Sequence, residues 1–333
     1  MQDRPVQEED VVWCYREFLG RLPESAAAVQ AHMSSARDFR TLVSRFIRCQ
    51  EFKLKRLPQD ALPMDRPEMD IEIDASESDL PRIMQGIRKA WAHMGQVRPH
   101  YSVLTSQEFQ PESINAESIE RFYASGGAGV STIVAVLRRY GFLGLDSKVC
   151  VEYGCGLGRM TLALAKIFKK VHGYDISASH LELAKQRAAD LGIRNADFHL
   201  CSAELVVENL EKCDFFCSYI VFQHNPPPIM RELIAAGLKS LRPGGIAIFQ
   251  VPTYQQGYSF RVSEYLAKPP TLDMEMHFIP QHAVFSLIGE QHCKVLEVRE
   301  DDWIGAGPSI SNTFVVQRPA GPRRLASRHA SPA

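Results

Sequence analysis

Apolar residues recur at helical spacing in two segments near the start of the chain. The first segment has apolar residues at positions 11, 12, 15, 18 and 19, and the second has them at 39, 42, 43, 46 and 47. Spacings of three and four residues place these side chains on one face of a helix. Residues 1–57 are therefore predicted to form a separate helical unit whose core is made of these positions.

A different pattern begins near residue 149. A short apolar run leads into a glycine turn and then into a helical segment at 160–169, and a short strand at 171–175 precedes a second helix at 177–191. Ser177 fits the N-cap of that helix, and Gly192 fits the position after its end. The order predicts an α/β unit. Three more elements are predicted towards the end of the chain: a helix at 280–293 and strands at 294–299 and 311–317.

Residues 58–80 are predicted to be a linker. Prolines at 58, 63, 67 and 81 punctuate a stretch that is rich in Asp and Glu, and such a stretch favours exposed, irregular chain. Helical signals resume with Ile83, Ile87 and Trp91. The last segment, 319–333, is rich in Pro, Ser, Ala and Arg and is predicted to be disordered.

The glycine turn carries the strongest chemical signal. Its glycines lie at 154, 156 and 158, whereas the dinucleotide fingerprint G-x-G-x-x-G would need its third glycine where the chain has Arg159. Glu152, just before the turn, would repel a pyrophosphate but would attract an ammonium group. The turn, the acid and the arginine together favour S-adenosylmethionine over a nicotinamide dinucleotide.

Residues 152–161 resemble motif I of the class I S-adenosylmethionine-dependent methyltransferases, an acid followed by x-G-C-G-x-G. The later segments keep the order of that family: 171–175 ends in an acid, 196–205 resembles the third strand and its turn, 214–219 the fourth strand, and 241–249 the fifth. The resemblance implies a doubly wound, mostly parallel sheet of seven strands, Rossmann-like, over residues 81–318. It also implies a helical lid at 81–145 and an acceptor-binding insertion at 253–279.

The same resemblance implies a set of cofactor residues. Asp175 lies 21 positions after Gly154, the distance expected for an acid that binds the ribose hydroxyls. Ser202 stands where the family usually has an aspartate beside the adenine. The cofactor-binding residues expected on this basis are Glu152, Gly154, Cys155, Gly156, Arg159, Asp175, Ile176, Ser202, Ala203 and Tyr219.

Methylation of a hydroxyl requires a base that removes its proton during attack. Two histidines have positional claims to this role: His224 follows the fourth strand, and His277 lies in the aromatic insertion. Tyr254 and Tyr258 of the insertion are candidates for binding the acceptor. The paired acids of metal-dependent O-methyltransferases are absent after strand four, and Cys213 and Cys217 have no second pair at metal spacing, so no metal is expected.

Composition narrows the class further. The chain has 333 residues, a net charge of −1 and eight scattered cysteines. The near-neutral charge gives no reason to expect a nucleic-acid partner. No apolar run approaches the ~20 residues that span a bilayer, and the start of the chain lacks the layout of a signal peptide. A cytoplasmic protein with free thiols is expected.

The N-terminal unit carries a second resemblance. Residues 15–23 read Y-R-E-F-L-G-R-L-P, and Glu51-Phe52 ends the pattern. This is similar to a bacterial helical module of unknown function that accompanies glycosyltransferases, methyltransferases and surface proteins. The resemblance implies O-methylation of a sugar in a surface polysaccharide or its precursor, with a glycosyltransferase or another polysaccharide-assembly protein as a partner. Two alternatives remain open: a small-molecule N- or O-methyltransferase, and a non-catalytic cofactor-binding scaffold.

Overall fold

A computed structural model of the chain describes residues 5–49, 51–52, 67–202, 207, 209–304 and 309–320. Two compact units divide the chain. One comprises residues 1–68 with 305–309, and the other comprises residues 69–304 with 310–333. The predicted disordered tail, apart from residues 319 and 320, lies outside the described residues, as do residues 58–66 of the predicted linker.

The first unit contains the expected N-terminal helices: α1 (Glu8–Leu19), α2 (Ala26–Ser35) and α3 (Phe39–Arg48). The side chains of Ser25 and Asp38 cap α2 and α3 by accepting backbone N–H bonds at 3.2 and 2.7 Å. Most of the predicted apolar positions are buried or half-buried, with Val11, Leu42 and Phe46 at the centre of the core, whereas the predicted core residue Ile47 is exposed. Helix propensity alone does not hold helices of this length, so their common core stabilises them.

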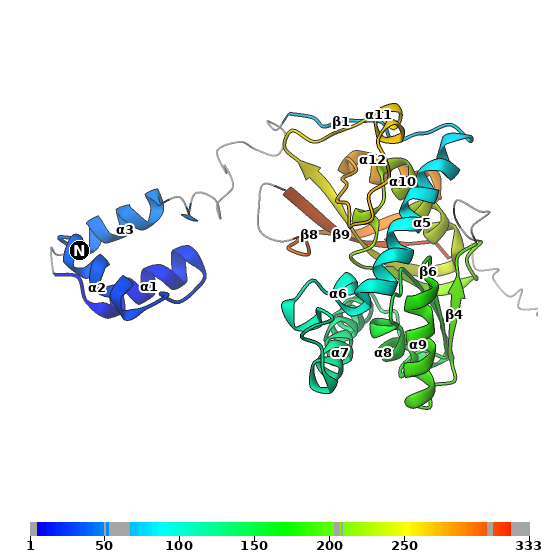
Figure 1. Cartoon of the computed structure of the whole chain (residues 1–333), viewed down its shortest axis with the longest axis horizontal. Coiled ribbons are helices and arrows are strands. Elements are labelled where there is room, and N and C mark those ends of the chain that lie inside the picture. The colour runs from blue at the N-terminus through cyan, green and yellow to red at the C-terminus, as the bar shows by residue number, and fades with distance from the viewer. Residues whose placement is uncertain are drawn as a thin grey trace, which may run out of the picture. The chain divides into compact units, whose positions relative to one another are not determined.

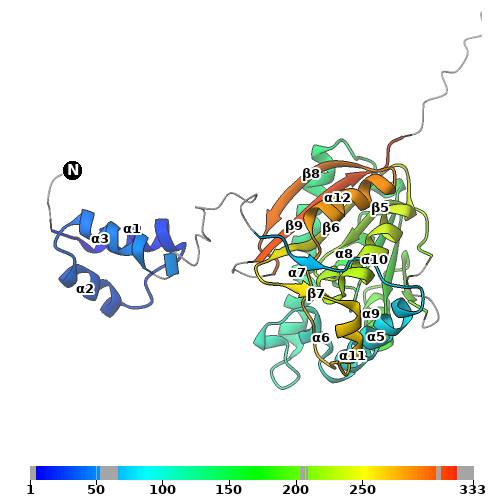
Figure 2. The same ribbon diagram turned by 90° about the horizontal axis from the view of Figure 1, so that it is seen from above.

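The second unit is built on a sheet of seven strands in the order β4-β3-β2-β5-β6-β9-β8 (Figures 1 and 2). The pairs β4–β3, β3–β2, β2–β5 and β5–β6 are parallel, and β8–β9 is antiparallel. The order reverses beside β2, so the fold is doubly wound, as predicted. The strands are β2 (Val149–Tyr153), β3 (Lys170–Asp175), β4 (Ala196–Leu200), β5 (Cys213–Ser218), β6 (Leu241–Gln255), β8 (Lys294–Asp301) and β9 (Ser309–Gln317).

Helices cover both faces of this sheet. Successive strand residues point to opposite sides, and the strands carry apolar side chains on both sides that must be covered. Cys150 and Phe215 pack in one core cluster with α7 (Ala116–Arg139) and α8 (Arg159–Ala165). Val151 and Phe216 pack in the other, with α5 (Asp79–Val97), α10 (Pro227–Ser240) and α12 (Gln281–Glu290). Figure 1 shows α10 and α12 above the sheet, and α7, α8 and α9 (Ala178–Asp190) below it. Each fully buried apolar side chain of this kind contributes about 1.5–3 kcal/mol.

The predicted lid region is helical: α5 is followed by α6 (Pro99–Val103), a short turn η2 (Gln107–Phe109), α7 and a second turn η3 (Leu145–Ser147). Helix α7 runs without a break from Ala116 to Arg139. It approaches α8 so closely at Gly126 that a Cβ there would lie 2.1 Å from the Arg159 carbonyl oxygen. Only glycine fits this crossing.

The predicted end of the linker at residue 80 is wrong. Residues 70–80 pack on the second unit: β1 (Asp70–Ile71) forms a parallel pair with β7 (Ser259–Phe260), and Ile71, Ile73 and Leu80 pack against a core cluster. The acidic composition misled the prediction because Asp70 pairs with Arg261 and the Glu72 carboxylate accepts the Val262 N–H at 2.6 Å.

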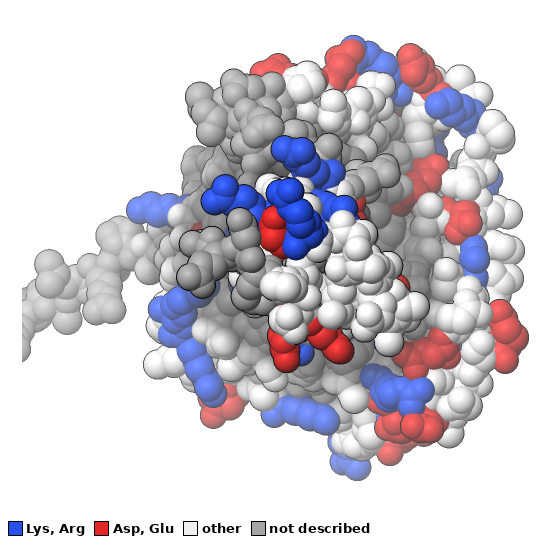
Figure 3. Space-filling view, turned by 90° about the vertical axis from the view of Figure 1, so that its left-hand side faces the viewer, with Lys and Arg blue, Asp and Glu red and all other residues white. Residues whose placement is uncertain are grey.

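The predicted insertion starts later than expected, because β6 runs on to Gln255. It then contains β7 and α11 (Val262–Ala267) before the chain reaches α12. No described helix is both long and apolar enough to cross a membrane. The side of the molecule in Figure 3 carries acidic and basic side chains together, and neither sign covers it.

Candidate active site

A cavity opens at the carboxyl ends of β2, β3 and β5. This is the edge of an open α/β sheet where the strand order reverses, and ligands bind there as a rule. Its wall includes Glu152 and the glycine turn after β2, Asp175 after β3 and His224 after β5. The lid contributes Trp91 of α5, together with Ser102 and Val103 of α6.

The glycine turn is fixed by backbone hydrogen bonds to β3. The Gly154 and Cys155 N–H groups donate to the Tyr174 carbonyl at 2.8 and 3.0 Å. Gly154 adopts φ 74°, and a Cβ there would lie 2.3 Å from Val221 Cγ2. The left-handed conformation and the close approach both require glycine. The turn therefore brings main chain, without side chains, to the cavity wall.

Asp175 holds the turn from the neighbouring strand. Its Oδ2 accepts the Gly156 N–H at 2.8 Å, and its Oδ1 accepts the Ser177 N–H at 2.9 Å, at the start of α9. The carboxylate is 8% exposed, and it lines the cavity. Asp175 therefore has a structural task that its sequence position alone did not reveal.

Glu152 is a buried acid beside a half-buried cation, Arg159. Burial raises the pKa of Glu152 to about 7, and the Thr161 hydroxyl donates to its Oε2. Arg159 also lines the cavity. Its pKa is lowered by burial, although the Glu152 charge acts in the opposite direction. The Arg159 guanidinium donates to Ser125 Oγ at 3.1 Å, and its Nε is buried without a hydrogen-bond partner among the described residues.

His224 lies where the main cavity meets a smaller one. Its Nδ1 is 2.8 Å from the Glu275 carbonyl oxygen, which can only accept, so Nδ1 carries the hydrogen and Nε2 keeps a lone pair. Trp91 packs on the imidazole with ring centroids 5.3 Å apart. Burial lowers the pKa of His224 to about 4. The imidazole is therefore neutral at pH 7, and its Nε2 can accept a proton or a hydrogen bond.

His277 is placed differently from His224. Its Nδ1 is 2.8 Å from the Tyr258 hydroxyl and its Nε2 is 3.0 Å from Glu275 Oε2, which also accepts from Tyr265. Both ring nitrogens are occupied, and His277 lines a large cavity of the insertion instead of the main one. The geometry fits a residue that positions Glu275 and Tyr258 better than it fits a base.

The cavities form a row through the molecule. The smaller cavity shares Trp91 and His224 with the main one, and it shares Tyr265 and Glu275 with the insertion cavity. The smaller cavity therefore lies between the other two, and the His224 imidazole belongs to the wall that it shares with the main cavity.

Most of the residues predicted for the cofactor site meet in the main cavity, whose wall includes Glu152, Gly154, Cys155, Gly156, Arg159, Asp175, Ile176 and Tyr219. Ser202 and Tyr254 line none of these three cavities. Tyr258 lines the insertion cavity. Ala203 lies outside the described residues.

Sequence reasoning missed several residues of the wall. Ile220 adopts φ 58°, which is rare for a β-branched residue and marks strain of the kind found at functional sites. His180 has its Nε2 2.9 Å from Ser102 Oγ, whereas its buried Nδ1 has no hydrogen-bond partner among the described residues. A histidine on the inner face of a predicted helix was the only available signal.

Part of the chain is similar to a known protein family. Residues 150–245 match the family model described as "Methyltransferase domain". A ubiquinone biosynthesis O-methyltransferase of Hydrogenovibrio crunogenus is 29% identical over 32% of this chain and 44% of its own length. A carboxy-S-adenosyl-L-methionine synthase of Campylobacter jejuni is 34% identical over 32% of this chain and 44% of its own length. The chain thus spans less than half the length of these two curated relatives.

A solved structure of similar outline is that of magnesium protoporphyrin IX methyltransferase from Synechocystis PCC 6803 with bound SAH. The sequences are 18% identical, the TM-score is 0.46, and the match covers 67% of this chain and 98% of that one.

Proposed function

We propose that this chain, whose residues 150–245 are a methyltransferase domain, transfers the methyl group of S-adenosylmethionine to a hydroxyl oxygen. The observation that carries the proposal is His224: a neutral imidazole with a free Nε2 stands between the main cavity and the cavities of the insertion. The O-methyltransferase among the relatives supports oxygen as the acceptor atom.

The residues of the main cavity fit the cofactor. Two of its buried nitrogens, Arg159 Nε as a donor and His180 Nδ1 as an acceptor, have no hydrogen-bond partner among the described residues, and a polar ligand would satisfy both. Glu152 would bind the ammonium group, the turn at Gly154 would face the methionine part, and Asp175 would accept from the ribose hydroxyls. When bound, the sulfonium supplies an activated methyl group.

His224 would then act as the base. Nε2 takes the acceptor's proton as the oxygen attacks the methyl carbon, and the Glu275 carbonyl stabilises the imidazolium through Nδ1–H. A base whose pKa is near 4 is weak in isolation. Loss of the sulfonium charge during the same step offsets the new positive charge on His224, so the site gains no net charge.

The acceptor we propose is a sugar of a bacterial surface polysaccharide or its precursor. The insertion cavity is lined by Tyr258, Phe260 and Tyr265, whose flat apolar faces suit sugar rings, and by the polar groups of Glu275 and His277. The likeness of the N-terminal unit to a module that accompanies glycosyltransferases supports this class and a partner from polysaccharide assembly. A cytoplasmic location would suit such a precursor.

The first test is direct binding. S-adenosylmethionine and S-adenosylhomocysteine are expected to bind with micromolar Kd, roughly −8 kcal/mol, in calorimetric titrations of the full chain. NADH should give no saturable heat. Binding of NADH without binding of S-adenosylmethionine would overturn the proposal.

The affinity for the cofactor is expected to depend on pH through Glu152. Because burial holds its pKa at about 7 in the free protein, a proton must leave Glu152 at pH 6 before the carboxylate can bind an ammonium group. The Kd for S-adenosylmethionine should therefore be about tenfold weaker at pH 6 than at pH 8. In Glu152→Gln the affinity should be low and independent of pH. A wild-type affinity that does not change over this range would exclude Glu152 as the ammonium partner.

A further inference from the structure

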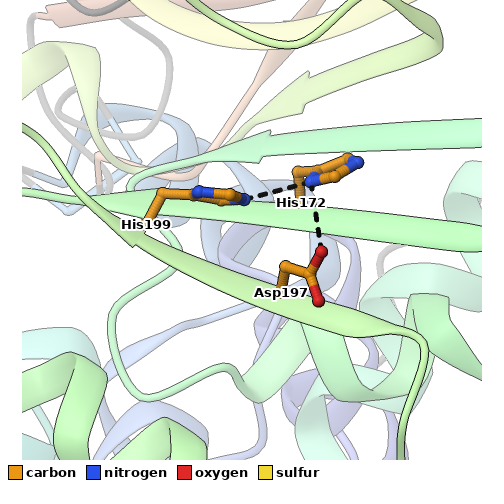
Figure 4. A group of neighbouring side chains, drawn as sticks. All are labelled: His172, Asp197 and His199. Carbon is orange, nitrogen blue, oxygen red and sulfur yellow. Dashed lines mark hydrogen bonds and ion pairs between the residues drawn. The ribbon is translucent and has the colours of Figure 1, made fainter.

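Three side chains that could ligate a metal meet on the sheet, away from the main cavity. His172 of β3 pairs directly with Asp197 of β4, and His199 lies two residues further along β4. Residues two apart on a strand share a face, so all three side chains lie on the same side of the sheet. Figure 4 shows the two imidazoles and the carboxylate turned towards one another. Within the described ranges, they form the one group of three or more His, Cys, Asp or Glu ligand atoms that lie within 4.8 Å of each other.

The distances are close to those of a metal site. His172 Nδ1 is 3.0 Å from His199 Nε2 and 3.8 Å from Asp197 Oδ2. An ion with ligands at about 2.0–2.1 Å in tetrahedral geometry separates its ligand atoms by about 3.3–3.4 Å. Shifts of a few tenths of an ångström in the side chains would bring all three atoms into place around one ion.

The neighbouring groups hold the ligands in orientation. The Lys170 ammonium lies 2.7 Å from Asp197 Oδ1, which leaves Oδ2 to face His172. Tyr174 stacks on His199 with ring centroids 4.6 Å apart and an angle of 17°. Such partners orient the ligands of metal sites. Lys170 also offsets the carboxylate charge, so the site offers mainly two imidazole nitrogens and disfavours Mg²⁺ and Ca²⁺.

We propose that His172, Asp197 and His199 bind one divalent transition-metal ion, of which Zn²⁺ is the leading candidate, with a water or another ligand in the remaining position. Two imidazoles and one carboxylate are ligands that Zn²⁺, Co²⁺ and Ni²⁺ accept. This site is independent of the proposed methyl transfer, because none of its residues lines the main cavity.

The ion would fasten the edge of the sheet. β4 is the outermost strand, it pairs only with β3 within the described sheet, and its residues are half-buried or exposed. β3 ends at Asp175, whose carbonyl accepts the Cys201 N–H just after β4 at 2.9 Å. A link from His172 to the two β4 ligands would therefore steady both strand ends beside the cofactor cavity.

The test uses the full chain without an affinity tag. Equilibrium dialysis against Zn²⁺, followed by elemental analysis, should find one ion per chain, and Co²⁺ should give visible absorption bands of a four- or five-coordinate nitrogen and oxygen site without a thiolate band. His199→Ala and His172→Ala should each weaken binding at least tenfold. The control, His282→Ala, replaces an exposed histidine of α12 and should bind as the wild type does.

Other results would overturn the proposal. The first is that the wild type retains no more Zn²⁺ than the double variant His172→Ala, His199→Ala. The second is that the Co²⁺ spectrum contains a thiolate band and that this band persists in the double variant. The melting temperature provides a second readout: Zn²⁺ should raise it in the wild type and in His282→Ala but not in the double variant. S-adenosylmethionine titrations of the same samples keep this outcome separate from that of the proposed function.

Discussion

His224→Ala is expected to lower kcat by about 10²–10⁴-fold while the Kd for S-adenosylmethionine changes little. The loss follows from removing the Nε2 lone pair of a residue that lines both the main cavity and the smaller one, whereas the glycine turn and Asp175 are left intact. Incorporation of labelled methyl groups into the acceptor measures the rate, and calorimetry measures cofactor binding.

His277→Ala is the matched control for His224, because it removes the other histidine with a positional claim. Its ring nitrogens are bound to Tyr258 and Glu275, so its loss should disturb the insertion cavity and raise KM more than it lowers kcat. A large fall in kcat for His277→Ala, with near-normal turnover for His224→Ala, would transfer the role of base. Normal turnover in both variants would favour an amine acceptor.

The pH profile provides an independent check on His224. Because its pKa is lowered to about 4, the imidazole stays unprotonated, and so able to take a proton, as the pH falls from 8 to about 5. At saturating cofactor, the wild-type kcat should therefore remain flat over that range and fall only as the pH approaches 4. A midpoint near 6.5, the ordinary histidine value, would mean that another histidine is the base.

Asp175→Ala is expected to weaken S-adenosylmethionine binding by about ten- to hundredfold, because hydrogen bonds to a charged group contribute ~1.5–3 kcal/mol. A second effect follows from the structure: the Gly156 and Ser177 N–H groups lose their acceptor. The free energy of unfolding of the free protein should therefore fall by an amount typical of a lost cap, ~0.5–2 kcal/mol, and its melting temperature should fall with it. Calorimetry and thermal melting measure the two effects on one sample.

Two variants separate these effects. Asp175→Asn keeps one oxygen acceptor and should recover part of the stability but little of the affinity. Asp190→Ala removes an exposed acid from the end of α9 and should change neither. An Asp175→Ala protein that binds the cofactor as tightly as the wild type would exclude the ribose contact.

The sequence predicted those parts of the site that are local in the chain. The glycine turn, Glu152 and Asp175 each lie at the end of a short apolar strand, and the parallel order of the strands brings them to one edge. The doubly wound, seven-stranded sheet was implied by the family resemblance, and the structure gives its strand order, with β2 between β3 and β5.

The rest of the site depends on contacts between distant segments. Trp91 reaches His224 from a helix more than a hundred residues earlier, and the strained φ of Ile220 reflects its neighbours instead of its own preference. The tautomer of His224 is set by the backbone carbonyl of Glu275 in the insertion, and because every residue has such a carbonyl, the sequence does not indicate which one lies beside the imidazole. The end of the linker was predicted wrongly for a similar reason. Asp70 and Glu72 have the composition of exposed chain, but their partners, Arg261 and the Val262 N–H, lie almost two hundred residues later in the sequence.

The pairing of β1 with β7 determines where the N-terminal unit could be replaced by that of another protein without disturbing the second unit. The first strand after the helical unit completes a wall of the insertion, where the Glu72 N–H donates to the Phe260 carbonyl at 3.0 Å. A chimaera joined at residue 80 would delete that strand and leave Phe260 without its cover, whereas one joined near residue 67 would keep it. A junction that keeps the insertion intact therefore lies more than ten residues before α5, the first long helix of the second unit.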